Sequence, residues 1–229
     1  MSEQGSTATE QETAVTVERR GHVLLMGLNR PQKRNAFNLT MIDQLAAAYY
    51  ELEEDEDLRC GVLFAHGDHF TGGLDLAEVG PVIQAGELKM TSEDRRDPWR
   101  KDAIWTTPIV AAVQGWVMTL AIELLLAADI RIAAENSRFS QMEINRGIYA
   151  FGGATIRLPR DAGWGNAMLA ADRRGLRRRR GIPDRASAGG RRDRQRARPR
   201  DRARRGDRHP FRAAGRQEDT RIRLSLIHI

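Results

Sequence analysis

The charge of this 229-residue chain changes abruptly near residue 168, and the change limits which part can form a folded core. Residues 1–168 contain 16 Lys and Arg against 24 Asp and Glu, whereas residues 169–229 contain 21 Arg, no Lys and 7 acidic residues. The second part also lacks apolar periodicity, so it cannot bury enough surface to offset the entropy that ordering costs. We therefore expect a disordered leader at residues 1–13, a domain at residues 14–168 and a disordered Arg-rich tail at residues 169–229.

Three further features limit the class of protein. The only cysteine, Cys60, cannot form a disulfide within the chain, and no Cys and His cluster has the spacing of a zinc site. The polar N-terminus has no apolar segment typical of a signal peptide. The most apolar stretch, Trp116–Ile130, contains Glu123 and Asp129 and is too short to span a bilayer. These features predict a cytoplasmic protein with no bound metal and no membrane partner.

The start of the domain predicts a hairpin followed by an amphipathic helix. Residues 14–30 have the pattern of two apolar strands joined by a tight turn at Arg20-Gly21. After a polar loop, apolar residues recur at helical spacing, and either Asn38 or Thr40 can cap the start of the helix. The residues on the predicted apolar face are Ile42, Leu45, Ala46, Tyr49 and Leu52.

The rest of the domain alternates strands with helices. The segments CGVLFAH, PIVAAVQG and DIRIAAE have the composition of short buried strands. A Gly72-Gly73 turn leads into one predicted helix, and a second predicted helix lies around Ala121–Ala128. Residues 85–104 are polar and weakly patterned, which predicts a mobile loop or a helical excursion over the surface. Strands that alternate with helices predict an α/β fold with packed layers.

Two glutamates, Glu123 and Glu143, lie within apolar or glycine-bearing stretches, GWVMTLAIELLLAADI and FSQMEINRGIYAFGGATIRL. A carboxylate among core residues is costly unless it is paired, neutralised or used. Taken alone, either glutamate is more often a paired structural residue than a catalyst. If the fold brings both carboxyl groups into one pocket, one can act as a general base and the other as a general acid.

Four ordered blocks of the domain resemble the crotonase superfamily, which contains the enoyl-CoA hydratases and isomerases. The blocks are NRPQKRNAFN, FTGGLDLAEV, PIVAAVQGWVMTLAIELLLAADIRIA and FSQMEINRGIYAFGGATIRLPRDAGWGNAM, and the resemblance covers about residues 14–168. One block alone is a weak signal, whereas four blocks in order at compatible spacing are specific. The resemblance implies a ββα spiral core, a coenzyme A thioester as the substrate and no separate cofactor.

By this resemblance, the backbone N–H groups of Leu74 and Leu120 form an oxyanion hole for the enolate of a thioester. Glu123 would orient and deprotonate the water that attacks the β-carbon, and Glu143 would protonate the α-carbon. Family members that only shift a double bond generally rely on one acid or base at the Glu143 position. The presence of both glutamates therefore predicts a 2-enoyl-CoA hydratase, with an enoyl-CoA isomerase or another acyl-CoA crotonase as the alternative.

The same resemblance places coenzyme A on two segments. Lys33, Arg34 and the backbone near Ala36 would cradle the nucleotide end, where the basic pair can meet the phosphates. The residues that would line the thioester and pantetheine are Leu74, Asp75, Leu76 and Ala77.

One departure from the family pattern concerns the acyl pocket. The chain has Thr119-Leu120-Ala121 where the family commonly has a run of glycines before the first glutamate. Leu120 can still donate its N–H, but side chains at these positions occupy space and restrict the backbone. We expect a narrower or differently shaped acyl pocket.

The tail has two interpretations. An Arg-rich arm binds nucleic-acid phosphates through charge, but only Phe211 offers a ring for stacking. Alternatively, its Arg, Ala, Gly, Asp and Pro content is typical of GC-rich DNA translated out of frame. Codons permitted for residues 169–192 allow the string WLLTGEDFDAAEAYRIGLLQEVV, which resembles the continuation of the family. We expect the frameshift and regard a nucleic-acid partner as the weaker interpretation.

The expected frameshift also affects the predicted oligomeric state. Crotonase-family chains close the acyl pocket and build a homotrimer or hexamer with helices that follow the region of Met168. We expect this chain to lack that helical trimerisation region and to be either poorly soluble or a loosened monomer. An inactive CoA-thioester or nucleic-acid binding protein with a basic arm is the alternative from another functional class.

Overall fold

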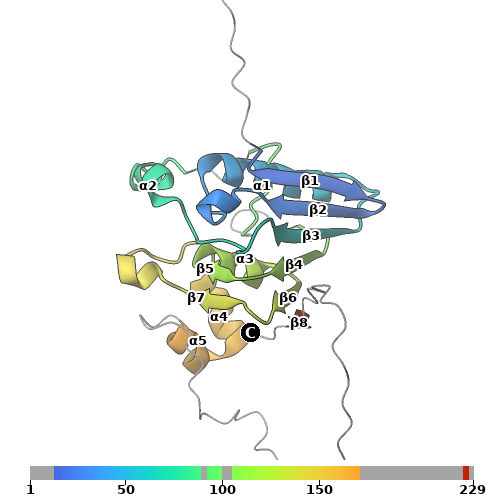
Figure 1. The fold of residues 1–229 in the computed structure, drawn as a ribbon. Helices are drawn as coiled ribbons and strands as arrows, with labels where there is room; N and C mark the ends of the chain where they lie inside the picture. The colour runs from blue at the N-terminus through green and yellow to red at the C-terminus, as the bar shows by residue number, and fades with distance from the viewer. Residues whose placement is uncertain (1–12, 89–91, 100–104, 171–223, 227–229) are drawn as a thin grey trace, which may run out of the picture. The chain divides into compact units, whose positions relative to one another are not determined.

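A computed structural model describes residues 13–88, 92–99, 105–170 and 224–226 (Figure 1). Nearly all of the predicted leader and most of the predicted tail lie outside these residues. Within the described ranges, no helix is long and apolar enough to cross a membrane. The same ranges contain no group of three or more His, Cys, Asp and Glu side chains that could hold a metal ion.

The first layer of the fold is a six-stranded sheet with the order β1-β2-β3-β4-β6-β8. Its strands are β1 Val15–Arg20, β2 Val23–Leu28, β3 Cys60–Ala65, β4 Ile109–Val113, β6 Ile130–Ala134 and β8 Leu224–Leu226. The predicted hairpin of β1 and β2 is confirmed, with Arg20 opposite Val23 and Gly21 at φ +59° in the turn. Strands β2, β3, β4 and β6 are parallel neighbours. Alternate apolar side chains of β2, β3 and β4 are buried in the core, whereas Ile130 at the start of β6 is exposed.

A second layer consists of short extended segments that follow the strands of the large sheet. β5 (Trp116–Met118) pairs with β7 (Arg138–Ser140), and isolated bridges join Thr71 to Val117 and Phe37 to Leu74. A helix follows each of three segments, and these helices are α1 Leu39–Glu54, α2 Leu76–Gln84 and α3 Leu120–Ala127. This repeat of strand, short strand and helix confirms the predicted α/β fold with a ββα spiral core.

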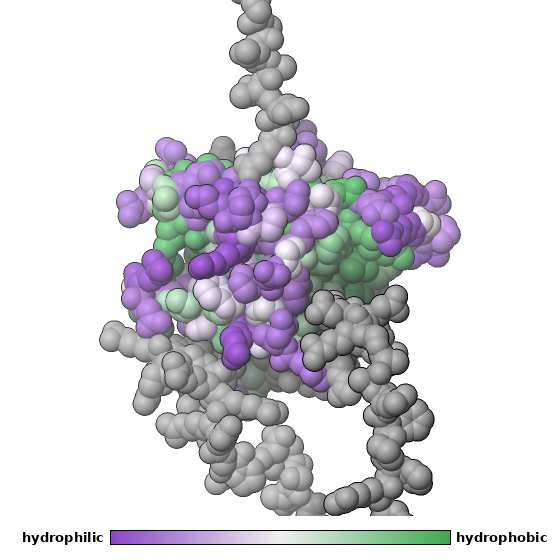
Figure 2. All heavy atoms as spheres, viewed as in Figure 1, coloured by the Kyte–Doolittle hydropathy of each residue, from purple (hydrophilic) through white to green (hydrophobic). Residues whose placement is uncertain are grey.

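The remaining helices are short; η1 precedes α1, whereas η2, α4 and α5 follow β7. They are η1 Pro31–Lys33, η2 Glu143–Arg146, α4 Ala154–Ala162 and α5 Trp164–Ala170. In Figure 1, α2 and the short yellow helix η2 lie on the same side of the sheets. Figure 2 shows that polar and charged side chains cover much of the face in view. Several large hydrophobic residues late in the domain are exposed, namely Ile144, Tyr149, Ile156, Trp164 and Met168.

Helix α1 has the predicted apolar face and a single defined cap. All five residues of the predicted face are buried. The side chain of Asn38 accepts a hydrogen bond from the N–H of Met41 at 2.9 Å, and Thr40 lies inside the helix. Of the two predicted alternatives, Asn38 is therefore the N-cap.

One expectation about an irregular segment differs from the structure. The described residues of 85–104 do not only cross the surface, because Asp97 and Trp99 are fully buried and Trp99 packs edge-on against Phe37. The predicted disorder from residue 169 onward falls mostly outside the described residues; within them, α5 runs through Ala170 and β8 pairs with β6. Leu and Ala favour continuation of a helix, and an unpaired edge strand such as that of β6 accepts an apolar segment.

We expect Asn38→Ala to lower the free energy of unfolding by about 1 kcal/mol, because the first turn of α1 loses a side-chain acceptor. Urea unfolding followed by circular dichroism measures the change. Thr40→Ala is the matched control and should stay within about 0.5 kcal/mol of the native value. Equal losses in the two variants would contradict the assignment of the cap.

Candidate active site

One cavity of about 350 Å³ collects side chains from four separate stretches of the chain. These stretches are the loop around η1, the segment before α2, the start of α3 and the region of η2. The lining residues are Lys33, Ala36, Gly72, Leu74, Asp75, Leu76, Thr119, Leu120, Glu123, Met142, Glu143, Arg146, Ile148 and Phe151. The cavity therefore brings together both predicted glutamates and both residues predicted to supply N–H donors.

The bridge between Phe37 and Leu74 sets the direction of the Leu74 N–H. The N–H of Phe37 donates to the carbonyl of Gly73 at 2.8 Å, and the N–H of Asp75 donates to the carbonyl of Phe37 at 2.9 Å. In a parallel pair, the backbone groups of the residue between these two bonds point to the opposite side. The N–H of Leu74 thus faces away from Phe37, and no carbonyl of the described chain accepts from it.

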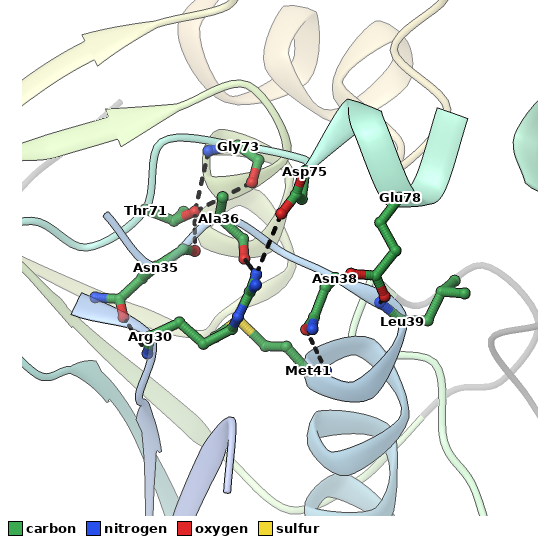
Figure 3. Close-up of polar contacts among 10 residues, drawn as sticks. All are labelled: Arg30, Asn35, Ala36, Asn38, Leu39, Met41, Thr71, Gly73, Asp75 and Glu78. Carbon is green, nitrogen blue, oxygen red and sulfur yellow. Dashed lines mark hydrogen bonds and ion pairs between the residues drawn. The ribbon is translucent and has the colours of Figure 1, made fainter. Parts of the chain in front are cut away.

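A polar network supports the segment that carries this first donor (Figure 3). The buried side chain of Arg30 donates to the carbonyl of Ala36 at 2.6 Å and lies 3.6 Å from the carboxylate of Asp75. The hydroxyl of Thr71 accepts from the N–H of Gly73 at 3.0 Å. These contacts hold the loop before α1 and the loop before α2 together, and so limit the movement of the donor between them.

Leu120, the second predicted donor, is the first residue of α3. An N–H in the first turn of a helix has no acceptor within the helix, and the helix dipole favours negative charge there. The peptides on both sides are held, because the N–H of Thr119 donates to the carbonyl of Ser140 at 2.8 Å and the indole of Trp99 donates to the carbonyl of Leu120 at 3.1 Å. The geometry of this end of α3 therefore suits an anionic oxygen.

Glu123 lies in the first turn of α3 with only 1 % of its surface exposed. Burial raises the pKa of Glu123 to about 7, and the nearby carboxylate of Glu143 adds to the rise. The backbone N–H groups of Ala154 and Gly152 oppose it, and Ala154 donates to Oε1 at 3.0 Å. Near neutral pH, both the charged and the neutral form of Glu123 are populated. Such a group can give or take a proton at physiological pH.

The backbone beside Glu123 comes close because residue 152 is glycine. A Cβ at Gly152 would lie 2.6 Å from Oε2 of Glu123, which no real contact allows. The guanidinium of Arg157 holds this segment by donating to the carbonyl of Gly152 at 3.0 Å and to the carbonyl of Trp99. Sequence reasoning missed Trp99 and Arg157, because their roles depend on contacts between distant segments and not on a local pattern.

Glu143 lies at the start of η2 and is half-buried. Burial raises the pKa of Glu143, and backbone N–H groups and the side chain of Gln141 partly oppose that rise. Neither the amide atoms of Gln141 nor Oε2 of Glu143 has a hydrogen bond of ordinary geometry to a described residue. A buried carboxyl oxygen without a partner fits a group that is kept for a ligand.

The residues predicted to bind coenzyme A divide into two sets. Lys33, Ala36, Leu74, Asp75 and Leu76 line the cavity, whereas Arg34 and Ala77 do not. The guanidinium of Arg34 instead lies 4.6 Å from the centre of the Trp116 ring, beside a second, more polar hollow.

The blocks that make up this cavity match one known family. The family model for enoyl-CoA hydratase/isomerase matches residues 18–172. The chain belongs to the enoyl-CoA hydratase/isomerase family. A probable enoyl-CoA hydratase/isomerase from Mycobacterium abscessus is 55 % identical in sequence, with a TM-score of 0.66 over 69 % of this chain and 62 % of that one.

Curated members of the family are also similar. Enoyl-CoA hydratase EchA19 of Mycobacterium tuberculosis is 35 % identical over 146 residues, which are 63 % of this chain and 55 % of that protein. The 2,3-dehydroadipyl-CoA hydratase of Escherichia coli is 35 % identical over 147 residues, which are 64 % of this chain and 56 % of that protein. The chain thus spans less than two thirds of the length of these relatives.

The raised pKa of Glu123 predicts a pH-dependent effect on stability. In the folded chain this carboxyl stays protonated at pH values where the unfolded chain has already lost the proton, so its contribution to stability falls as the pH rises from about 4.5 to about 7. Glu123→Gln cannot ionise and keeps an acceptor for Ala154. We expect this variant to be more stable than the native chain, by a margin that grows by about 2 kcal/mol between pH 5 and pH 8.

Urea unfolding at both pH values measures that margin. Glu135→Gln, which changes an exposed glutamate, is the matched control and should show no such growth. A margin for Glu123→Gln that is constant or that shrinks with pH would contradict the burial of an ionisable Glu123.

Proposed function

We propose that this chain binds a 2-enoyl-CoA thioester in the cavity and adds water across its double bond. The observation that carries the proposal is that one cavity contains two unengaged backbone N–H groups, the buried carboxyl of Glu123 and the half-buried carboxyl of Glu143, both with a raised pKa. The N–H groups suit an oxygen that gains negative charge, and the carboxyls suit proton transfer near neutral pH. Membership of the family supports the same reaction.

The proposed reaction begins at Glu123. Its carboxylate takes a proton from water as the water oxygen bonds to the β-carbon, and the electron pair of the double bond moves towards the thioester oxygen. The N–H groups of Leu74 and Leu120 hold the resulting enolate. Protonated Glu143 then donates its proton to the α-carbon, which completes the 3-hydroxyacyl thioester. The carboxylate of Glu143 contributes to the raised pKa of Glu123, so the two groups are coupled, and the proposed starting state holds one proton between them, on Glu143.

The burial of Glu123 favours hydration over a shift of the double bond. An isomerase that uses only the Glu143 position has no need of a second carboxyl whose burial costs stability. Glu123 is almost completely buried, and the hydrogen bonds from its neighbours offset the cost of burying its charge only partly. Its pKa therefore stays raised. A functional demand for a second acid or base accounts for this cost.

The positions of Lys33 and Ala36 support binding of the coenzyme A moiety along the same cavity. The cytoplasmic location and the loss of trimer assembly stay predictions from the sequence.

Replacement of either glutamate tests the proposed mechanism. We expect Glu123→Gln and Glu143→Gln each to lower kcat for crotonyl-CoA hydration by about 100-fold or more, because each removes one proton-transfer step. A spectrophotometric assay of the unsaturated thioester measures the rate, and Glu135→Gln is the control. Near-native turnover in either glutamine variant would contradict the two-carboxyl mechanism. Binding of crotonyl-CoA by the native chain without any turnover would instead favour an inactive thioester-binding protein.

The two basic residues of the first loop should differ in their effect on coenzyme A. We expect Lys33→Ala to weaken acyl-CoA binding about 10-fold, because it removes a charged donor from the cavity wall. Arg34→Ala should weaken it less than about 3-fold, because its guanidinium lies on Trp116 outside the cavity. Isothermal titration with butyryl-CoA measures both. A larger loss for Arg34→Ala would place the nucleotide end on the Trp116 side.

A further inference from the structure

Thr119 has a backbone conformation that is unusual for its side chain. Its φ of 53° and ψ of −115° match the first central position of a type II′ turn, which glycine dominates. A β-branched residue with positive φ is strained, and such strain persists where the surrounding structure enforces it. Glycine would allow the same chain path without strain. The threonine side chain must therefore be explained by something other than the turn.

The side chain of Thr119 is packed against the segment that carries the other donor. A Cβ built on Gly73 would lie 2.4 Å from Oγ1 of Thr119, so the hydroxyl occupies the space that glycine leaves at residue 73. Gly73 and Thr119 each directly precede one of the two N–H donors, Leu74 and Leu120. The hydroxyl thus lies where the two donor segments meet, and Thr119 lines the cavity.

The hydroxyl of Thr119 has no hydrogen-bond partner among the described residues. A hydroxyl can rotate to donate to an oxygen beside it, and a hydrogen bond to an oxygen that gains negative charge is stronger than one to a neutral oxygen. Its neighbours in the cavity wall are the two N–H groups that suit such an oxygen.

We propose that the Thr119 hydroxyl is a third hydrogen-bond donor to the thioester oxygen of the bound acyl-CoA, acting with the N–H groups of Leu74 and Leu120. This inference rests on the proposed function of the cavity. It explains why threonine occupies a position where its backbone is strained, because threonine adds a hydrogen-bond donor that glycine lacks. It also predicts that the hydroxyl contributes most when the oxygen carries the charge of the enolate.

Three variants separate the hydroxyl from the shape of the side chain and from the strain. Thr119→Val keeps the branched shape and the strain but removes the hydroxyl. Thr119→Ser keeps the hydroxyl, and Thr119→Gly removes both the hydroxyl and the strain. If the Thr119 side chain only narrows the pocket, the valine variant should have the same activity as the native chain.

Hydration of crotonyl-CoA by the full chain is the first readout. We expect Thr119→Val and Thr119→Gly to lower kcat on the order of 10- to 100-fold with little change in KM, and Thr119→Ser to stay within about 3-fold of the native rate. Thr119→Gly should also unfold at a higher temperature than the native chain, because the strain is gone. Native kcat in the valine or glycine variant, or equal losses in the serine and valine variants, would overturn the proposal.

Binding of acetoacetyl-CoA is a second readout that needs no turnover. The enolate of this thioester absorbs in the near ultraviolet, so its fraction in the bound state is measured directly. We expect Thr119→Val to lower the ratio of bound enolate to bound keto form about 10-fold at a fixed pH, and Thr119→Ser to preserve it. An unchanged ratio in the valine variant would overturn the role of the hydroxyl.

The two readouts distinguish failure of the inference from failure of the proposed function. A native chain that does not hydrate crotonyl-CoA but binds acetoacetyl-CoA as the enolate contradicts the hydratase function and still tests Thr119 through the ratio. If the native chain hydrates crotonyl-CoA and Thr119→Val does so equally well, the proposed function stands and the role of Thr119 as a third donor is excluded. A native chain that binds neither thioester overturns both.

Discussion

The pairing of short extended segments in the second layer is the constraint on which the candidate site depends. Because Phe37 bonds to the residues on either side of Leu74, the N–H between them is turned away from the pair. The same layer continues through Thr71 and Val117 to β7, and it leads the chain into α3 at Leu120. One hydrogen-bonded ladder therefore sets the directions of both donors, and the side chains of these two leucines are secondary.

The two carboxyls differ from the N–H groups, because burial raises their pKa values. Glu123 is carried into the core by a helix that is otherwise apolar, and the backbone of residues 152–154 offers only partial compensation. Gly152 allows that backbone to approach, while Arg157 and Trp99 hold it in place. The raised pKa that results is a cost to the fold and the property that proton transfer needs.

Local patterns in the sequence predicted much of this arrangement. The hairpin, the apolar face of α1 and the main strands follow from periodicity, because each periodic face has one buried side. The two glutamates stood out because a carboxyl in an apolar stretch is an exception to that pattern. Trp99, Arg157 and the strain at Thr119 could not be predicted in this way. Each depends on contact with a segment at least twenty residues away, and Trp99 lies in a stretch whose polar composition indicates surface.

A crystal structure of the full chain with bound acetoacetyl-CoA tests the central claim most directly. We predict that the thioester oxygen lies about 3 Å from the backbone nitrogens of both Leu74 and Leu120, with the acyl carbons between Glu123 and Glu143. A thioester oxygen more than about 4 Å from either nitrogen, or an acyl group bound outside this cavity, would contradict it.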